Sequence, residues 1–451
     1  MVRTSSEVPT HRQKPTIRAV LSRGRVLSVF TAFLLLAAAT SAHAAGIALY
    51  ETGAPDLGTA SAGRAAMAAD ASTVATNPAG MTLLDRSQFM FTSGAMLPAI
   101  NFDRGSDTNV RNGGGGGGNA GVFFPIGGVF YAHKLTDRLW AGVAVDSNFG
   151  LASDYSLNWV GRYYQTNSSL ITGQIVPNVA YRINEWLSVG AGFSFSIARF
   201  KTQAKINNPL PRFGEGGLSI ESWDEAFGGN IGFLIRPISR LRIGLTYNSP
   251  VDFKFGFHPF MTNLSPGLRA SLKKSGLLGA KVNLSQTEPQ QMMASGLYQL
   301  TPALALMGNV GWQNWSQFGQ TELGISAQTQ KNLAVNLNYS NTIQIAFGGQ
   351  YRLANRWLLS AGFAYDSSPV SEANRTPNLP LDRQLRYGTG VQYEINKDFV
   401  LGIANEVLDG SNAPYDVKRG PLSGRVQGDF SSNIIDFLGI NLVWKLGPSG
   451  Q

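Results

Sequence analysis

The sequence predicts an all-β fold, a 14-stranded antiparallel transmembrane β-barrel, and three observations lead to this prediction. Beyond residue 50, every long stretch is interrupted by charged residues, Gly or Pro, so no segment supplies the roughly 20 apolar residues of a membrane-spanning helix. Charged residues make up 14% of the chain and Gly supplies 52 of its 451 residues, whereas soluble domains contain about 25% charged residues and about 7% Gly. Apolar residues alternate with small or polar ones over runs of about 10 residues, as in membrane barrels.

Two segments show this alternation clearly. Between residues 384 and 395, mostly apolar side chains such as Tyr387 occupy the odd positions, and small or polar residues such as Arg386 occupy the even ones. The segment 342–353 repeats the pattern, with Phe347 on its apolar face. Because successive side chains of a strand point to opposite faces, each segment would turn an apolar face to lipid and a polar face to a lumen.

Short polar turns recur along the chain, each followed by an aromatic or aliphatic residue that would begin a strand. Six such turns would join twelve strands, and strands near 87–100 and 432–446 would bring the total to 14, an even number that can close. The turns lie at 136–140, 184–187, 239–241, 301–304, 354–357 and 396–399.

The connections at the other end are longer and hold most of the Gly, Pro and Asn. Outer-membrane barrels have this asymmetry, with the short turns on the periplasmic side. The long connections are expected at 102–121, 150–170, 204–222, 259–281, 319–340, 367–382 and 409–430. Six Trp residues near the expected strand ends would form aromatic girdles at the membrane interfaces, or else pack in the core: Trp140, Trp186, Trp312, Trp315, Trp357 and Trp444.

The N-terminal 44 residues have the features of a cleaved secretory signal peptide. A stretch with six Lys or Arg precedes an uncharged, mostly apolar run at 26–40, and Ala42-His43-Ala44 is a small-residue cleavage site. The next 40 or so residues are too few to fold alone, but a compact segment of small residues could fill a barrel lumen. The expected organisation is a signal peptide at 1–44, an N-terminal hatch segment at 45–85, a barrel at 86–446 and a short extension at 447–451.

Charge and composition argue against several classes of function. The first 44 residues hold six basic and one acidic side chain, which leaves 31 basic and 27 acidic side chains in residues 45–451, too balanced for a nucleic-acid surface. The chain has no Cys, and beyond the signal only His133 and His258 remain, too far apart for a His-cluster metal site. We therefore expect no metal, no cofactor and no catalytic residues.

The most informative motif lies in residues 58–81. This stretch consists largely of Ala, Gly, Ser and Thr, contains Ala69-Asp70-Ala71 and ends on Asn77-Pro78-Ala79-Gly80-Met81. It resembles the N-terminal plug of the FadL/TodX family of bacterial outer-membrane transporters for hydrophobic compounds. In physical terms, Asn can cap a turn and Pro fixes its backbone angle. The resemblance implies a hatch that contains Asp70, Asn77, Pro78, Ala79 and Gly80.

Two further blocks share the resemblance. Residues 147–164, which begin Ser-Asn-Phe-Gly-Leu, are similar to the family's third strand and the loop after it, and residues 364–383 form the second block. In the family, a kink in the third strand opens the barrel wall sideways, which makes Asn148 and Gly150 the candidate kink residues. The family's usual Pro-Phe-Gly stands as Asn-Phe-Gly here, and Gly150 remains conformationally permissive.

The segment 149–164 is the candidate for substrate binding, because it is more apolar than a long exposed loop should be. Its apolar side chains could line a groove that collects hydrophobic molecules, or they could pack against one another. Its cation could pair with a substrate carboxylate or form an internal ion pair. The candidate residues are Phe149, Leu151, Tyr155, Trp159, Arg162 and Tyr163.

By this resemblance, the chain is expected to be an outer-membrane channel for passive uptake of long-chain fatty acids or aromatic hydrocarbons, with release sideways into the membrane. Expected partners are the hydrophobic substrate, outer-membrane lipids and lipopolysaccharide, and the barrel-assembly machinery. A general hydrophilic porin is an alternative, although its lumen should be lined with charge. A barrel lipase or protease is a weaker alternative, because a Ser–His–acid set needs a His and no Gly-x-Ser-x-Gly occurs.

Overall fold

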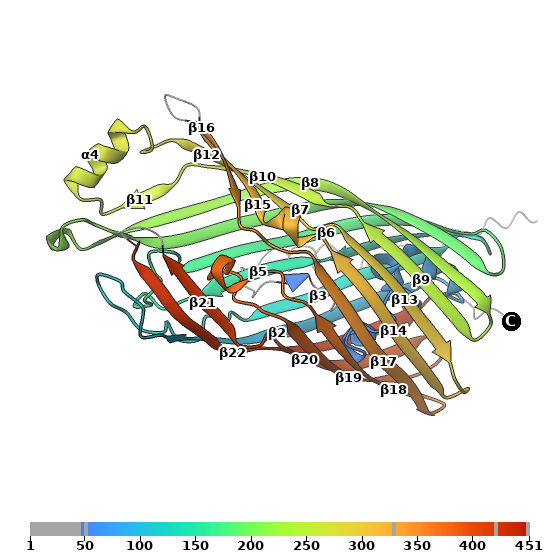
Figure 1. Ribbon diagram of the computed structural model, residues 1–451. Coiled ribbons are helices and arrows are strands. Elements are labelled where there is room, and N and C mark those ends of the chain that lie inside the picture. The colour runs from blue at the N-terminus through green and yellow to red at the C-terminus, as the bar shows by residue number, and fades with distance from the viewer. Residues whose placement is uncertain (1–46, 49–52, 327–330, 419–422, 448–451) are drawn as a thin grey trace, which may run out of the picture. The chain divides into compact units, whose positions relative to one another are not determined.

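The protein folds as a closed barrel of 14 antiparallel strands, which confirms the predicted fold class (Figure 1). The computed structural model describes residues 47–48, 53–326, 331–418 and 423–447. Each barrel strand pairs with the next one along the chain, and the last pairs with the first in a ladder that places Phe89 opposite Trp444. The barrel strands are β2 (Gln88–Arg104), β3 (Phe124–Lys134), β4 (Leu139–Asp146), β6 (Asn167–Arg182), β7 (Leu187–Asn207), β8 (Glu215–Ile238), β9 (Leu241–Asn248), β13 (Gln291–Gln299), β14 (Leu304–Gln313), β17 (Thr342–Ala354), β18 (Trp357–Asp366), β19 (Gln384–Glu394), β20 (Phe399–Asp409) and β22 (Arg425–Lys445).

The six short turns and the two faces of the strands also agree with the sequence. The turns join β3 to β4, β6 to β7, β8 to β9, β13 to β14, β17 to β18 and β19 to β20. Phe347 on β17 is 67% exposed and Tyr387 on β19 is 49% exposed, whereas Gln344 and Arg386 on the opposite faces are buried. The apolar faces therefore point outward, and the small and polar faces line the lumen.

The end opposite the short turns contains more regular structure than the sequence indicates (Figure 1). Four strands form a separate antiparallel sheet: β10 (Val251–Phe257), β12 (Lys281–Glu288), β15 (Gln320–Ser326) and β16 (Lys331–Asn336). The other elements here are β5 (Phe149–Asp154), η2 (Pro211–Phe213), β11 (Phe260–Thr262), α4 (Pro266–Lys274), α5 (Trp315–Phe318), η3 (Glu372–Asn374) and β21 (Ala413–Lys418). Long connections of outer-membrane barrels face the outside, so we call this the outer end and the other the periplasmic end.

The prediction of a long loop at 204–222 is wrong over most of its length. Strands β7 and β8 stay paired as far as Asn207 opposite Glu215, which leaves only residues 208–214 as the connection. The predicted loops at 319–340 and 409–430 likewise contain β15, β16, β21 and the start of β22. Strands that extend beyond the membrane have no lipid-facing side, so they lose the apolar alternation by which a membrane strand is recognised.

Some of the Trp residues lie where an aromatic girdle would, and others are buried in the core. Trp186, Trp357 and Trp444 are 52%, 43% and 46% exposed, and they lie next to periplasmic turns, as an aromatic girdle requires. Trp140 and Trp315 are buried, so the girdle prediction is wrong for these two. Trp140 packs inside the lumen, and Trp315 lies in α5 at the outer end.

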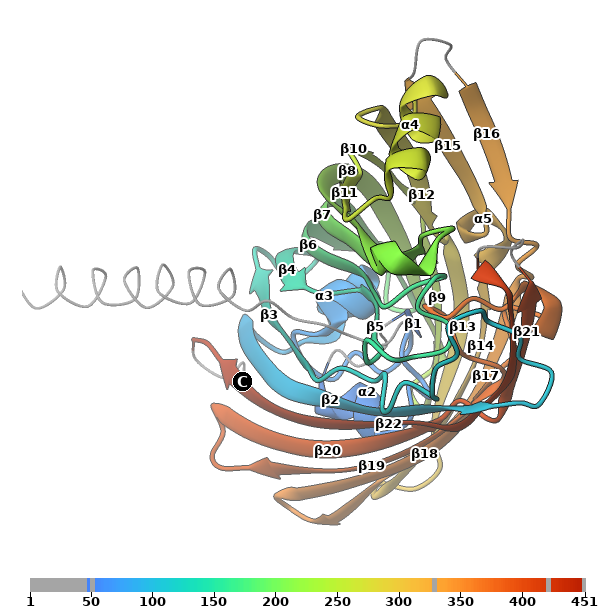
Figure 2. The same ribbon diagram turned by 90° about the vertical axis from the view of Figure 1, so that its left-hand side faces the viewer.

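The N-terminal segment, which we define as residues 53–87, lies inside the barrel (Figures 1 and 2). It contains α2 (Ala54–Gly58), α3 (Thr73–Thr76) and the 3-10 helix η1 (Pro78–Leu83), and the short strand β1 (Ile47–Ala48) comes before it. Figure 2 shows these elements in blue, encircled by the strands. Most of its side chains are buried, so the segment packs against the lumen wall over much of its surface.

Among the residues that the structure describes, no helix has both the length and the apolar character needed to cross a membrane.

Candidate functional site

Polar side chains of the barrel wall hold the N-terminal segment in place. The Asn309 side chain on β14 accepts a hydrogen bond from the backbone N–H of Gly63 (3.0 Å), and Ser295 on β13 accepts one from Ala65 (3.1 Å). On the other side of the lumen, Asn178 on β6 donates to the carbonyl oxygen of Val74 (3.1 Å). In a segment of short helices and turns, many backbone N–H and C=O groups have no hydrogen-bond partner within secondary structure. Side chains of the barrel wall provide the partner for these three backbone groups.

The lumen wall also contains glycines where the N-terminal segment comes closest. A Cβ atom at Gly244 on β9 would overlap the carbonyl oxygen of Ala65, and one at Gly362 on β18 would overlap that of Thr59. These close approaches account for part of the high Gly content, which the sequence analysis took as an indication of a membrane barrel.

Asn77 to Gly80 form the centre of the N-terminal segment. The Asn77 side chain caps η1 by accepting from the N–H of Ala79 (3.1 Å), and its amide donates to the carbonyl oxygens of Ala65 (2.7 Å) and Phe233 (3.1 Å). One side chain thus joins two parts of the segment to strand β8 of the wall. Pro78 begins η1, where the missing N–H costs nothing.

The other predicted hatch residue, Asp70, shapes the turn before α3. Its carboxylate accepts from the backbone N–H of Ser72 (3.0 Å) and from the Ser72 hydroxyl (2.6 Å). All five predicted hatch residues therefore lie in one buried stretch of the segment. Their bonds explain how the segment keeps its shape, and their role as a hatch stays a prediction.

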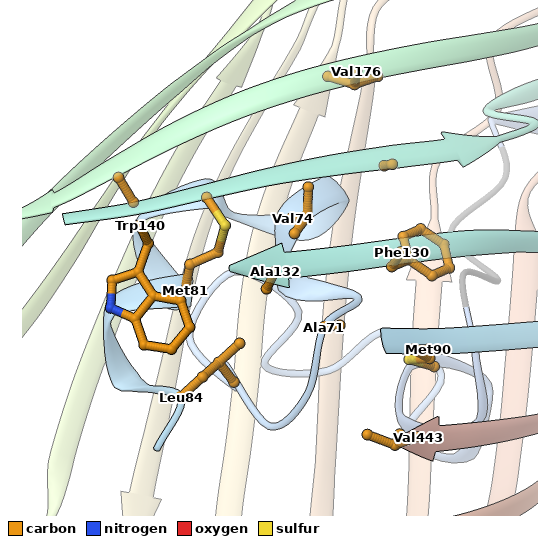
Figure 3. Close-up of a cluster of buried hydrophobic side chains, with 12 residues drawn as sticks. Ala71, Val74, Met81, Leu84, Met90, Phe130, Ala132, Trp140, Val176 and Val443 are labelled. Atoms are coloured by element: carbon orange, nitrogen blue, oxygen red, sulfur yellow. The ribbon is translucent and has the colours of Figure 1, made fainter. Parts of the chain in front are cut away.

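A hydrophobic cluster fixes the segment to the first strands of the barrel (Figure 3). Val74, Met81 and Leu84 come from the segment and pack with Trp140 of β4 and Phe130 of β3. Burying such side chains is worth roughly 1.5–3 kcal/mol each. The contact therefore holds this side of the segment firmly against β3 and β4.

The barrel wall is interrupted between β4 and β5. The ladder between β3 and β4 ends where Gly128 lies opposite Asp146, while β5 continues along β6 on one side and pairs with β1 on the other. Residues 124–127 of β3 thus have no ladder partner on β5 among the described residues. The break falls at Ser147 and Asn148, and Gly150 lies within β5. The role of Asn148 and Gly150 as a kink that opens the wall stays a prediction.

Side-chain hydrogen bonds connect the residues at this break to β6 and to β12. Asn148 accepts from the Thr172 hydroxyl (2.9 Å) and donates to the Glu288 carboxylate, and the Ser147 hydroxyl donates to the carbonyl oxygen of Thr172 (2.7 Å). Glu288 lies at the end of β12 and is buried. The bond from Asn148 therefore connects the interrupted strand to the sheet at the outer end, a link that the sequence did not indicate.

A cavity lies between the N-terminal segment and the break in the wall. Its lining includes Arg64 and Thr76 of the segment, Ile126 of β3, Asn148 at the break and Glu288. Arg64 pairs with Asp56 (2.9 Å) and is the cationic residue among those that line the cavity. The lining mixes polar groups with apolar side chains such as Val176, Met293 and Trp312. We call this cavity the chamber.

The predicted substrate-binding segment is packed rather than exposed. Phe149, Tyr155, Trp159 and Tyr163 are all less than 10% exposed, and the side chain of Leu151 lies outside the described ones. The Tyr155 and Trp159 rings stack at 3.8 Å between centroids, and Phe149 packs at 5.6 Å from Phe318. The prediction of an exposed apolar groove is therefore wrong for these four side chains, and the alternative of mutual packing is realised.

Arg162 forms an ion pair and hydrogen bonds with nearby residues at the outer end. It forms an ion pair with Glu215 (2.8 Å) and donates to the carbonyl oxygens of Gly113 (2.7 Å) and Trp159 (3.0 Å). Burial alone would raise the pKa of the Glu215 carboxyl, but hydrogen bonds from Arg162 and Tyr163 outweigh it and hold that pKa below its usual range. Arg162 therefore fits the internal ion pair, and its role as a substrate ligand stays a prediction.

Fold and site together define an outer-membrane transport barrel with a packed lumen. The chain belongs to the outer membrane protein transport protein family (OMPP1/FadL/TodX), whose profile matches residues 35–435. It is 27% identical over 406 residues to a "Long-chain fatty acid transport protein" of Escherichia coli O6:H1, covering 83% of this chain and 89% of that protein. It is 28% identical over 426 residues to "Outer membrane protein P1" of Haemophilus influenzae, covering 84% of this chain and 89% of that protein.

Two solved structures share the fold. A Pseudomonas aeruginosa FadL homologue superposes with a TM-score of 0.81 at 20% identity, covering 89% of this chain and all of that one. The Ralstonia pickettii toluene transporter TbuX superposes with a TM-score of 0.63 at 15% identity, covering 88% of this chain and 99% of that one.

Proposed function

We propose that this chain is a passive uptake channel for hydrophobic compounds in which the N-terminal segment acts as a hatch. One observation carries the proposal: the segment fills the lumen directly beside a chamber that reaches the break between β4 and β5. A polar solute would meet the packed segment on the way to the periplasm. A hydrophobic molecule has a second way out, because the break offers a path from the chamber into the membrane.

We infer that the break is the exit. Ile126 of β3 and Asn148 both line the chamber, and they flank the place where the ladder between β3 and β4 stops. A molecule in the chamber would therefore reach lipid without crossing the N-terminal segment. In this account the segment shifts only enough to let the substrate enter the chamber.

Long-chain fatty acids are the substrates we favour over aromatic hydrocarbons. The chamber offers polar groups beside apolar side chains, which suits a molecule with a polar head and an apolar chain. A hydrocarbon without a head group would use only the apolar part of this lining. The long-chain fatty acid transport protein of Escherichia coli supports this choice, as does the structural likeness to a FadL homologue.

We further propose two steps that precede transport. Residues 1–44 would be removed as a signal peptide during export. The barrel-assembly machinery would insert the mature chain, with β22 closing the barrel against β2.

Uptake by cells that lack their own channel for fatty acids tests the proposal. Cells that express this chain should take up labelled oleate faster than cells with an empty vector, with no gain in uptake of a sugar of similar mass. Equal gains for the sugar would indicate a hydrophilic porin. Faster uptake of toluene without faster uptake of oleate would overturn the choice of substrate, but it would still support a channel for hydrophobic compounds.

A further inference from the structure

One part of the outer end carries all the excess positive charge of residues 45–451. The segment 251–281 contains five Lys or Arg and one acidic residue. Residues 45–451 contain 31 basic and 27 acidic residues in total, so the rest is balanced at 26 of each. We call residues 251–281 the basic lobe; they comprise β10, β11, α4 and the first residue of β12.

The two strands of the lobe place their cations on one exposed face. Along β10, Phe253 and Phe255 are buried while Lys254 between them is exposed. Strand β12 runs antiparallel beside it, and the ammonium group of Lys281 lies 3.8 Å from where a Cβ of Gly256 would be. Lys254 and Gly256 are two residues apart and so share a face. The buried side packs against the protein, and the face with the two Lys points to solvent.

Helix α4 adds three more cations. Arg269, Lys273 and Lys274 are all exposed, and no residue of α4 is buried. Leu268 and Leu272, four residues apart on one side of the helix, are only half-buried. Figure 1 shows α4 projecting beyond the barrel at the outer end. The helix thus presents cations beside partly uncovered apolar side chains, as helices that rest on a lipid surface do.

These cations have no acidic partners within the described part of the chain. None of the five forms an ion pair there, although other outer-end cations are paired, such as Arg199 with Glu221 (2.7 Å). The acidic Asp252 of the lobe accepts instead from the Thr287 hydroxyl (2.6 Å), and Asp224 on β8 accepts from the backbone N–H of Lys254 (2.6 Å). Five cations that lack an acidic partner in the described part of the chain thus lie within 31 residues, and they are free to meet an anionic surface outside the chain.

We propose that the basic lobe binds the phosphate groups of lipopolysaccharide in the outer leaflet around the barrel. The chain lies in the outer membrane, and lysine and arginine pair strongly with phosphate. The lobe's cations do not line the chamber, so they are not placed to hold a substrate there. Contact with several phosphates at once would fix the outer sheet relative to the membrane, and Glu288 at the end of that sheet binds Asn148 at the break.

Binding to nanodiscs tests this assignment with the full chain. The probe is rough lipopolysaccharide, compared with the same lipopolysaccharide after its phosphates have been removed. The variants are Arg269→Gln with Lys273→Gln and Lys274→Gln, and separately Lys254→Gln with Lys281→Gln. The matched control is Arg138→Gln with Arg240→Gln and Arg356→Gln, which removes three exposed cations from periplasmic turns.

Each cation near an anionic surface contributes about 1 kcal/mol, roughly fivefold in affinity. The triple variant of α4 should therefore bind phosphorylated lipopolysaccharide on the order of a hundredfold more weakly and carry less of it through purification. The periplasmic control should bind as the parent does, and dephosphorylated lipopolysaccharide should not distinguish the variants. Unchanged binding by both lobe variants would overturn the proposal. So would normal lipopolysaccharide binding combined with a loss of oleate uptake, which would make the lobe a collector of anionic substrate. Heat-modifiable migration in gels shows that each variant has folded.

Discussion

At the scale of single residues, Arg162 illustrates how a cation in an apolar segment can be structural. A lone cation among aromatic residues has the composition of a carboxylate receptor, and the sequence left that possibility open. Each of its three guanidinium nitrogens instead donates a hydrogen bond to a nearby residue at the outer end, and Glu215 accepts two of these bonds. These bonds join residues 112–113, 159–163 and 215 into one unit.

Removing this cation should therefore affect every substrate alike. Arg162→Gln removes the hydrogen bonds that join these residues, so it should loosen the packing at the outer end and lower oleate and toluene uptake by similar factors. Glu215→Gln should act in the same direction, because it leaves the buried Arg162 without its acidic partner, at a cost of roughly 2–5 kcal/mol. Arg199→Gln, which breaks the more exposed pair with Glu221, is the control and should change little. Loss of oleate uptake with toluene uptake intact would make Arg162 a ligand for the substrate carboxylate.

At the scale of elements, the contact between the N-terminal segment and the wall depends on glycines at points of close approach. Gly244 on β9 lies against the carbonyl oxygen of Ala65, whereas a Cβ at Gly296 on the adjacent strand β13 would meet open space. The two glycines sit in neighbouring strands of one ladder, where Gly244 is opposite Ser295 and Gly296 is opposite Ile243. They form a matched pair that differs in contact with the segment.

We expect Gly244→Val to displace the segment and Gly296→Val to leave it in place. Conductance of purified channels in planar bilayers measures the result. The Gly244 variant should show frequent openings to small ions, because part of the lumen is no longer filled. The Gly296 variant should stay as closed as the parent. Equal conductance of the two variants would mean that the wall contact at Ala65 does not keep the lumen closed.

The break between β4 and β5 is held by side chains that can be exchanged. Asn148→Pro removes the bonds to Thr172 and Glu288 but installs a residue that by itself disrupts a strand ladder, so oleate uptake should be kept. Asn148→Val removes the same bonds and adds a residue that favours a continuous strand, so uptake should fall severalfold. Uptake assays in cells with matched expression compare the two. A loss of oleate uptake in the Asn148→Pro variant, or unchanged uptake in the Asn148→Val variant, would contradict an exit at this break.

The sequence predicted the elements that follow a simple physical rule. Strands such as β17 and β19 were found because one face meets lipid and the other the lumen, and the six turns were found because they are short and polar. The outward extensions of β7 and β8 were missed, because outside the membrane neither face meets lipid and the apolar alternation is lost. Residues that act across long sequence distances, such as Glu288 with Asn148 or Asn309 with Gly63, carry no local signal and could not be predicted.

At the scale of the whole molecule, two segments of the chain fill the barrel. The N-terminal segment occupies the lumen from within, and the aromatic side chains of residues 149–164 pack at the outer end. The chamber lies beside the segment and reaches the break in the wall. In the proposed function, a hydrophobic compound would leave the chamber through this break, while the N-terminal segment would block the passage of polar solutes.

The orientation of the barrel gives a prediction for intact cells. A Cys at Gly115, which is exposed in the first long connection, should react with a membrane-impermeant thiol reagent. A Cys at Asn355, in the turn between β17 and β18, should react only after the cells are opened. The chain has no Cys of its own, so each signal comes from a single site. Labelling of position 355 on intact cells would reverse the assignment of the two ends.

The central claim is that the N-terminal segment must shift for a hydrophobic compound to pass, and a reversible tether tests it most directly. Cys residues at Ala65 and Ser295, whose backbone N–H and hydroxyl lie 3.1 Å apart, would join the segment to β13 when oxidised. We predict that oxidation lowers oleate uptake by about tenfold or more and that reduction restores it, while neither single-Cys variant responds. Equal uptake by the oxidised and reduced double variant would contradict the account.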